Sequence, residues 1–300
     1  MKHLRKLLDL SGEEILDILN LADQLKFEQK HGIAHRKLEG KSLGMIFQKA
    51  STRTRVSFEV GITQLGGYPL VLSASDMQMG RGEPIQDTAR VLSRYLDGIM
   101  IRTFSQQDVE DLATYGTIPI INGLTDAAHP CQVLADLMTV REYKGKLEGL
   151  KLCYLGDGNN MANSLIVGGL KVGMTVAVAT PKGYEPHPQA LAFAAGNPAF
   201  TLTSDVFAAA KDADVIITDV WASMGQEGES GARRQAFEGF QVNAKLMAEA
   251  KPDAMVQHCL PAHREEEITT EVFESHPEIF DEAENRLHAQ KAVLVKLLAD

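Results

Sequence analysis

The sequence has few cysteines and no long apolar run. Three cysteines occur among 300 residues. Cys131, Cys153 and Cys259 are far apart and form no CxxC pair, which argues against a disulfide scaffold and favours a reducing cytoplasm. No apolar stretch approaches the roughly 20 residues that span a bilayer, and the N-terminus lacks the apolar core of a secretion signal. We therefore expect a cytoplasmic protein with no membrane partner.

Positive charge is also in short supply. The 30 Lys and Arg residues are outnumbered by 40 Asp and Glu residues, which gives a formal net charge of -10. An acidic chain repels phosphate backbones, so we expect no nucleic-acid partner. His129 has no neighbouring ligands at zinc spacing, and Cys259 with His263 does not complete a site, so we also expect no metal.

Apolar runs typical of strands alternate with amphipathic stretches typical of helices in both halves of the sequence. This alternation predicts two α/β domains, each with a central parallel sheet flanked by helices. We place the boundary in or just after a helix predicted over residues 133–143, which gives domains over residues 1–144 and 145–281. In open sheets of this type, ligands bind beyond the carboxyl ends of strands. Five candidate residues fall at such ends and predict an active site in the interdomain cleft: Ser51, Arg102, His129, Asp219 and Cys259.

The most informative segment covers residues 51–55, with the sequence Ser-Thr-Arg-Thr-Arg. It lies between a strand-like run and a helix-like run, and a helix start offers free backbone N–H groups and a positive dipole end. Hydroxyl groups and guanidinium forks match phosphate oxygens. The segment therefore predicts a site for a small phosphate-bearing ligand. The structural alternative is a Ser or Thr helix cap with surface arginines.

Two further segments carry reactive side chains beside predicted strands. His129 and Gln132 precede a helix, and an imidazole can polarise a carbonyl group while a glutamine can bind an amide. Cys259 lies near the end of a strand predicted over residues 255–260, where a thiol can act as a nucleophile or as a hydrogen-bonding partner. The alternatives are a structural histidine and a buried structural cysteine.

The glycine-containing segment at residues 156–163 follows a strand and opens a helix, as a dinucleotide-binding loop does. It lacks the third glycine, and the next strand ends at Thr180 rather than at an acidic residue, so a nicotinamide dehydrogenase is disfavoured. Its asparagines can bind a carboxylate or cap the helix. Asp219, at the end of a strand predicted over residues 215–219, can hold an ammonium group or cap the next element.

Taken together, six segments resemble the aspartate/ornithine carbamoyltransferase family. They occur in family order and cover nearly the whole chain, so a chance match to all of them is improbable. The segments are residues 47–55, 79–84, 101–103, 129–132, 219–225 and 258–261.

Within that family the chain is most similar to members that use ornithine. The resemblance implies transfer of a carbamoyl group from carbamoyl phosphate to the δ-amine of L-ornithine, giving citrulline and phosphate in arginine biosynthesis. It implies that no cofactor is needed and that the protein is a homotrimer or an assembly of trimers. It also implies that the N-terminal domain binds carbamoyl phosphate and that the C-terminal domain binds ornithine. It further implies a last helix, within residues 282–300, that returns to the N-terminal domain, and a cis Leu260–Pro261 bond.

The resemblance also implies the site residues. The carbamoyl phosphate-binding positions would be Ser51, Thr52, Arg53, Thr54, Gln78, Arg102, His129, Pro130, Cys131, Gln132, Cys259, Leu260 and Arg286. The ornithine-binding positions would be Asn163, Asp219, Ser223 and Met224. The catalytic residues would be Arg53, Arg102, His129, Asp219 and Cys259.

Each catalytic residue has an expected role in acyl transfer. Residues 51–54 would stabilise the leaving phosphate, while Arg102, His129 and the Thr54 hydroxyl would donate to the carbonyl oxygen. Asp219 and Cys259 would orient the neutral amine.

Some alternatives remain open at the level of sequence. Putrescine and acylated ornithine are acceptors of the same class, although putrescine has no carboxylate for Asn163 to contact. An aspartate-using enzyme would need extra cationic contacts. A non-catalytic sensor of a phosphate ligand would share the motifs without turnover. Many family members carry Glu where this chain has Gln48, and we expect this difference not to change the reaction.

Overall fold

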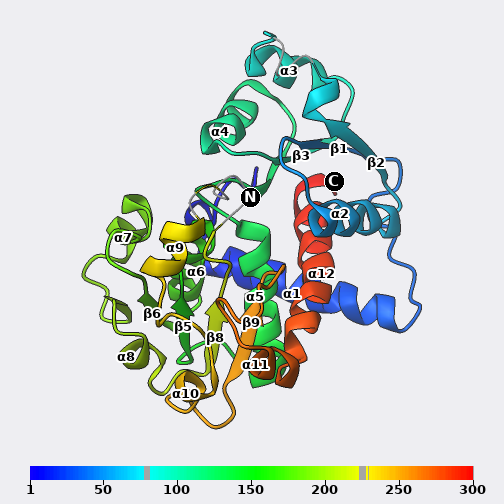
Figure 1. Ribbon diagram of the computed structural model, residues 1–300. Helices are drawn as coiled ribbons and strands as arrows, with labels where there is room; N and C mark the ends of the chain where they lie inside the picture. Colours follow the sequence, from blue (N-terminus) through cyan, green and yellow to red (C-terminus); the bar gives the residue numbers. More distant parts are fainter. Residues whose placement is uncertain (78–81, 223–227, 229, 300) are drawn as a thin grey trace. The chain divides into compact units, whose positions relative to one another are not determined.

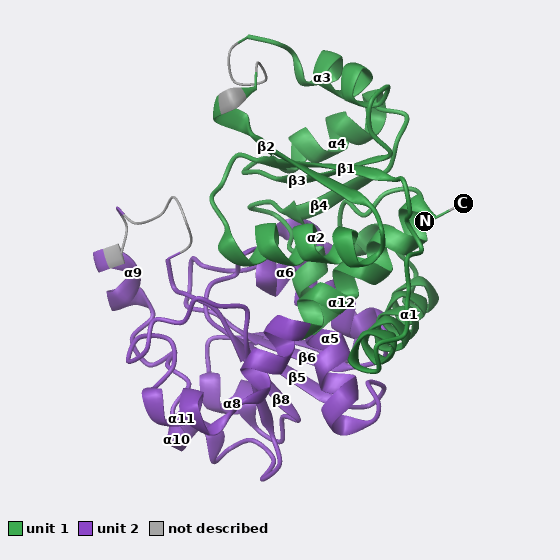
Figure 2. Cartoon of the chain, turned by 90° about the vertical axis from the view of Figure 1, so that its right-hand side faces the viewer, with its two compact units in different colours: residues 1–135, 285–300 green, residues 136–284 purple. Residues whose placement is uncertain are grey.

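The computed structural model describes residues 1–77, 82–222, 228 and 230–299. The chain forms two compact units (Figure 2). Unit 1 contains residues 1–135 and 285–300, and unit 2 contains residues 136–284. The C-terminal part of the last helix therefore belongs to the same unit as the N-terminal half of the chain.

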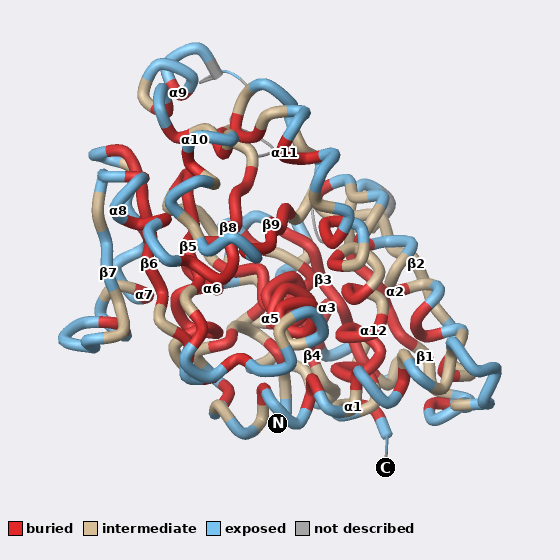
Figure 3. The backbone as a smooth tube through the Cα atoms, turned by 90° about the horizontal axis from the view of Figure 1, so that it is seen from below, coloured by how far each residue is buried: buried red, intermediate tan, exposed pale blue. Residues whose placement is uncertain are grey.

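The chain passes between the units inside two helices, α5 (Pro130–Lys144) and α12 (Glu278–Leu298). The sequence-based boundaries, after residues 144 and 281, stay predictions, and the two compact units divide inside the helices, at residues 135/136 and 284/285. Helix α5 is buried without interruption over residues 130–140 (Figure 3). Because this helix contains no polar linker, composition gives no sign that the units divide within it.

Unit 1 alternates strands and helices along the chain (Figure 1). Before α5, its elements are η1 (Leu7–Asp9), α1 (Gly12–Lys30), β1 (Ser42–Phe47), α2 (Thr52–Gln64), β2 (Tyr68–Ser73), η2 (Ala74–Asp76), α3 (Ile85–Leu92), β3 (Gly98–Arg102), α4 (Gln106–Tyr115) and β4 (Ile120–Leu124). The strands form one parallel sheet in the order β2-β1-β3-β4.

The first helix and the outer strand of unit 1 each have a clear structural cause. Helix α1 begins with the capping box that its sequence predicts, because the Ser11 hydroxyl accepts from the Glu14 N–H over 3.0 Å and Glu14 Oε2 accepts from the Ser11 N–H over 2.8 Å. The outer strand β4 is covered by the N-terminal segment. Leu4 donates to Ile120 O over 2.9 Å and accepts from the Asn122 N–H over 2.7 Å, which satisfies groups that an open edge would expose.

Unit 2 has the same architecture. Between α5 and α12, its elements are β5 (Lys151–Leu155), α6 (Asn160–Lys171), β6 (Thr175–Ala179), α7 (Pro188–Ala194), β7 (Phe200–Thr203), α8 (Val206–Ala210), β8 (Val215–Thr218), α9 (Ser230–Ala236), α10 (Ala244–Met247), β9 (Met255–His258) and α11 (Thr270–Ser275). The strands pair in parallel in the order β7-β6-β5-β8-β9. The predicted class, two parallel-sheet α/β domains, is thereby confirmed.

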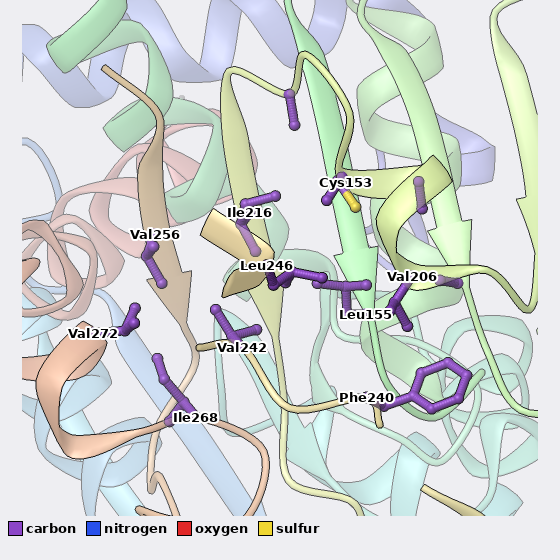
Figure 4. Packing of buried hydrophobic residues seen from close by; sticks show 14 of the residues in the cluster. Cys153, Leu155, Val206, Ile216, Phe240, Val242, Leu246, Val256, Ile268 and Val272 are labelled. Carbon is purple, nitrogen blue, oxygen red and sulfur yellow. The ribbon is translucent and has the colours of Figure 1, made fainter. Parts of the chain in front are cut away.

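The sheet of unit 2 buries apolar side chains beneath short helices (Figure 4). Leu155, Ile216 and Val256 come from β5, β8 and β9, and they share one cluster with Val206 of α8 and Leu246 of α10. Alternate residues of a strand point to one face, so these positions build a continuous core layer. Within the described residues, no helix has the length and apolar content needed to cross a membrane.

The outer strand of this sheet, β9, is closed by two carboxylates of α12. Glu278 accepts from the Val256 N–H over 3.0 Å, and Glu282 accepts from the His258 N–H over 2.9 Å. Four helical residues rise about 6 Å and two strand residues about 6.6 Å, so the two spacings match. The helix therefore supplies the acceptors that a further strand would have supplied.

Each sheet has one point where the strand order reverses. It lies between β1 and β3 in unit 1 and between β5 and β8 in unit 2. Loops leave such a point in opposite directions and open a crevice at the carboxyl ends of the two strands. The topology therefore selects two loop pairs, one in each unit, as candidate sites.

Candidate active site

The segment after β1 in unit 1 begins helix α2. Ser51 is the N-cap residue, and its side chain accepts from the Thr54 N–H over 3.1 Å. Arg55 is exposed and lies 3.4 Å from Glu59. Ser51 thus caps the helix and Arg55 lies on the surface, while phosphate binding by Ser51 stays a prediction; Thr52 is exposed. Thr54 is buried and contacts two neighbouring elements.

Thr54 joins the two sides of the unit 1 switch point. Its Oγ1 accepts from Arg286 Nη2 of α12 over 2.6 Å and lies 3.4 Å from Arg102 Nη1 at the end of β3. Both arginines are more than nine-tenths buried. Two guanidinium groups therefore converge on one hydroxyl at the start of a helix, which is an arrangement suited to an anion.

His129 lies in the same electrostatic environment. It directly precedes α5, which begins at Pro130 rather than at the predicted residue 133, since proline is well suited to the first position of a helix. Burial lowers the pKa of His129 well below its ordinary value, and the charges of Arg286, Arg102 and Arg53 lower it further. The imidazole is therefore neutral near pH 7, with one N–H donor and one acceptor nitrogen.

The first turn of α5 contributes two more predicted residues. Gln132 is buried. Cys131 donates from Sγ to Asn122 O over 3.6 Å, and burial raises the pKa of its thiol to about 12. Cys131 therefore remains a neutral thiol, and direct contacts of Pro130, Cys131 and Gln132 with a ligand stay predictions.

In unit 2, the loops after β5 and β8 meet through Asn159 and Asp219. Asn159 Nδ2 donates to Asp219 Oδ2 over 2.8 Å, while the Val220 N–H donates to Asp219 Oδ1 over 2.8 Å. Asp219 is buried. A buried carboxylate held by neutral donors has no positively charged partner among these contacts, so this arrangement is suited to a cationic group.

Cys259 follows β9 and contacts the same carboxylate. Its Sγ donates to Asp219 Oδ1 over 3.1 Å. Burial raises the pKa of the Cys259 thiol well above its ordinary value, and the nearby charge and hydrogen bond of Asp219 raise it further. A protonated thiol is a poor nucleophile, so the structure favours the hydrogen-bonding role over the nucleophilic one. The expected cis Leu260–Pro261 bond is present.

Three possible metal ligands gather at this point, since single ligand atoms of Asp219, His258 and Cys259 lie within 4.8 Å of one another. Both ring nitrogens of His258 are already engaged. Nδ1 accepts from the Leu260 N–H over 2.9 Å, and Nε2 lies 3.1 Å from Glu267 Oε1. The group therefore offers no complete donor set without breaking these contacts.

The remaining predicted ornithine contacts are less well defined. Asn163 Oδ1 accepts from the His187 N–H over 2.8 Å, so this side chain supports the segment before α7. Its contact with a substrate carboxylate stays a prediction. Gln78, Ser223 and Met224 lie outside the described residues.

Sequence reasoning missed one polar connection near Asp219. Arg233 of α9 donates from Nη1 to Asp157 Oδ2 over 2.8 Å and to Trp221 O over 2.9 Å. It thereby ties the loop after β5 to the segment after β8. The partners are far apart in the sequence and belong to no motif, so no local signal reveals them.

Comparisons with known proteins agree with this geometry. Residues 2–142 match the carbamoyl-P binding domain of the aspartate/ornithine carbamoyltransferases, and residues 148–297 match their Asp/Orn binding domain. An ornithine carbamoyltransferase of Carboxydothermus hydrogenoformans is 58% identical over 296 residues, covering 97% of this chain and 95% of that protein.

Solved structures are similar over almost the whole chain. The ornithine carbamoyltransferase from Pyrococcus furiosus superposes with a TM-score of 0.95 at 57% identity, covering 99% of this chain and 97% of that chain. The anabolic enzyme from Campylobacter jejuni gives a TM-score of 0.93 at 43% identity, covering 99% of both chains. Sequence motifs, both domain matches and the fold agree: the chain belongs to the aspartate/ornithine carbamoyltransferase family.

Proposed function

We propose that this protein transfers the carbamoyl group of carbamoyl phosphate to the δ-amine of L-ornithine, giving L-citrulline and phosphate. The observation that carries the proposal is the convergence of Arg102 and Arg286 on Thr54, near His129, whose pKa is lowered by burial and then by these charges. The similarity to proteins named ornithine carbamoyltransferase supports ornithine as the acceptor.

In this mechanism, unit 1 activates carbamoyl phosphate. The Arg53, Arg102 and Arg286 guanidinium groups and the N-terminus of α2 stabilise negative charge on the phosphate as the C–O bond breaks. Neutral His129 donates its single N–H to the carbonyl oxygen, where charge builds up during attack. Burial disfavours an imidazolium ion at this position, and the charges of the three arginines disfavour it further, so the pKa of His129 lies well below its ordinary value.

Unit 2 prepares the acceptor. An alkyl ammonium with a pKa near roughly 10.4 is about one part in 10³ neutral at pH 7, so a site that favours the neutral δ-amine lowers the barrier. Asp219 holds the α-ammonium group, and the protonated Cys259 lies beside it as a neutral hydrogen-bonding partner for the δ-amine. The δ-amine then attacks the carbamoyl carbon, phosphate leaves, and the excess proton passes to phosphate or water.

Assembly and pathway form a second part of the proposal. We propose a cytoplasmic homotrimer that acts in arginine biosynthesis. The anabolic designation of the Pyrococcus furiosus relative supports the pathway. Exposed apolar side chains on α2 and on the outer strand β2 support self-association, since Val56 is 51% and Tyr68 is 65% exposed. Light scattering after gel filtration measures the mass, and a monomer would contradict this part.

The activity is tested by citrulline formation with purified protein and carbamoyl phosphate. Ornithine, putrescine, N-acetylornithine and aspartate are compared in parallel. We expect turnover with ornithine alone. Turnover with another acceptor would keep the unit 1 mechanism and overturn the roles given to unit 2. Binding of carbamoyl phosphate without turnover on any acceptor would favour a sensor of a phosphate ligand.

A further inference from the structure

Asn159 connects the backbone of α6 with Asp219. Its Oδ1 accepts from the Met161 N–H over 2.9 Å and from the Ala162 N–H over 3.3 Å, which makes it the N-cap of α6. Its Nδ2 donates to Asp219 Oδ2 over 2.8 Å. One amide therefore serves the helix with its oxygen and the carboxylate with its nitrogen.

The orientation of this amide is fixed by its partners. Backbone N–H groups can only donate, so the side-chain oxygen must face α6 and the NH₂ group must face Asp219. The Tyr154 hydroxyl lies 3.3 Å from the same oxygen and 2.9 Å from Asp157 O. Burial raises the pKa of Tyr154 well above its ordinary value, so this hydroxyl keeps its proton and remains a donor.

The hydrogen bonds of Asp219 define the direction that it leaves open. An ionised carboxylate has about four lone-pair positions. Asn159 takes one on Oδ2, and the Val220 N–H and the Cys259 thiol lie on Oδ1. All three contacts come from neutral donors on fixed elements, and they hold the carboxylate against rotation. Among the described residues, these contacts leave a position on Oδ2, beside Asn159.

We propose that Asn159 is a positioning residue for the acceptor: it fixes the rotation of the Asp219 carboxylate so that one oxygen lone pair is presented to the substrate ammonium group. The inference rests on the proposed function, because it assigns the ammonium of ornithine to Asp219. It extends that function by naming the residue that sets the orientation of the carboxylate toward the ammonium group. Asn159 itself needs no contact with substrate.

The test must separate this role from helix capping. Asn159→Ser keeps a good N-cap residue but is too short to donate to Asp219. The matched control is Asn243→Ser, since Asn243 caps α10 by accepting from the Leu246 N–H over 3.1 Å. We expect the KM for ornithine to rise about tenfold in Asn159→Ser, in line with the loss of one hydrogen bond to a charged group. The KM for carbamoyl phosphate should stay within about twofold.

A pH profile gives a readout that capping alone would not move. In Asn159→Asp, the introduced carboxyl group donates to Asp219 when it is protonated at low pH and repels it when it is ionised at high pH. We expect kcat/KM for ornithine, relative to the unmutated protein, to fall as the pH rises. The Asn159→Ser variant should show a deficit that does not depend on pH.

A substrate-free measurement separates failure of this inference from failure of the proposed function. Alkylation of Cys259 by iodoacetamide, followed by mass spectrometry against pH, reports the thiolate fraction. A second carboxylate near Asp219 should move the alkylation midpoint of Asn159→Asp to higher pH, and Asn243→Asp should leave it unchanged. A changed midpoint without ornithine turnover in the unmutated protein would keep the contact but overturn the substrate assignment. Unchanged alkylation and an unchanged KM for ornithine would overturn the inference.

Discussion

The two units have the same type of sheet topology, but unit 1 gathers positive charge at its switch point and unit 2 gathers negative charge. Unit 1 places Arg102 and Arg286 around a hydroxyl at its switch point, whereas unit 2 places Asp219 among neutral donors at the corresponding point. In both units burial disfavours the charged form of an ionisable neighbour. Burial lowers the pKa of His129, which loses its proton, and raises the pKa of Cys259, which keeps it. The comparison teaches that each site gathers one sign of charge and that burial disfavours the charged form of the histidine or cysteine beside it.

The largest expected effect comes from removing a unit 1 cation. Arg286→Ala should reduce kcat/KM for carbamoyl phosphate by about 10²–10³, because a donor to developing negative charge is lost. The KM for ornithine should change by less than about threefold if the two sites act separately. Steady-state kinetics with each substrate varied measures both values. Arg55→Ala is the control, since Arg55 is exposed on α2, and an equal loss there would contradict the assignment.

A second cation in unit 1 tests how buried charge affects stability. Lys291 is 0% exposed, and its Nζ lies 2.8 Å from Gln29 Oε1, 3.1 Å from Gln64 Oε1 and 3.2 Å from His35 Nε2. Burial lowers the pKa of Lys291 to about 8, although nearby Glu28 opposes the shift. Unit 1 thus holds this cation with neutral acceptors, as unit 2 holds Asp219 with neutral donors.

The sign of the resulting pH dependence follows from linkage. Between about pH 8 and the ordinary lysine value near roughly 10.4, the unfolded chain binds a proton at Lys291 that the folded chain does not. The free energy of unfolding therefore rises with pH within that window, and this gain is lost as the pH falls to 8. Lys291→Met removes the effect. From pH 7.5 to 9.5, the unmutated protein should gain about 2 kcal/mol relative to the variant in urea unfolding. If the free energies of unfolding of the two proteins changed in parallel with pH, the pKa of Lys291 would not be lowered by folding.

The third prediction concerns the thiol of unit 2. Cys259→Ala removes the donor to Asp219 and should raise the KM for ornithine about tenfold, equivalent to about 1.4 kcal/mol. Cys259→Ser keeps a hydroxyl donor and should recover most of this loss. Substrate-saturation curves for both variants decide the point. If serine were as poor as alanine, the sulfur atom itself, rather than its hydrogen bond, would be required.

The smallest effect is expected at Gln48. Its Nε2 lies 3.3 Å from Asp108 Oδ2, and Thr103 Oγ1 lies 2.8 Å from the same oxygen. Gln48→Glu would place two carboxylates together and should cost about 1 kcal/mol of stability at pH 7. The cost should vanish under acid conditions, where the pair carries a proton. Turnover should change by less than about twofold, and a larger change would contradict the expectation that this difference from the family leaves the reaction unaffected.

The sequence predicted two strands of unit 2 correctly, but it placed their last residues one and two positions too late. Strands predicted over residues 215–219 and 255–260 end at Thr218 and His258. The reason lies in side-chain hydrogen bonds, because Asp219 accepts from its neighbour Val220 and leaves the ladder. Cys259 likewise falls outside the strand, where its thiol reaches Asp219. Propensity treats both residues as strand continuations because it contains no information about these partners.

The sequence by itself determined the α/β alternation, the helix caps and the family. Those features depend on local periodicity, on residues three apart in a capping motif, or on short motifs whose order survives in one chain. It also indicated which residues carry charge at strand ends. It did not determine what neutralises, orients or supports them.

Tertiary structure alone decided the pairings. Thr54 meets Arg286 from more than 200 positions away, Asn159 turns its amide toward Asp219, and Lys291 finds neutral acceptors on other helices. Protonation follows from burial and from charges that folding brings together, so the neutral state of His129 could not be read from its neighbours in the chain. The physical reason is that short-range sequence patterns specify elements, whereas a buried charge responds to every group that packing places around it.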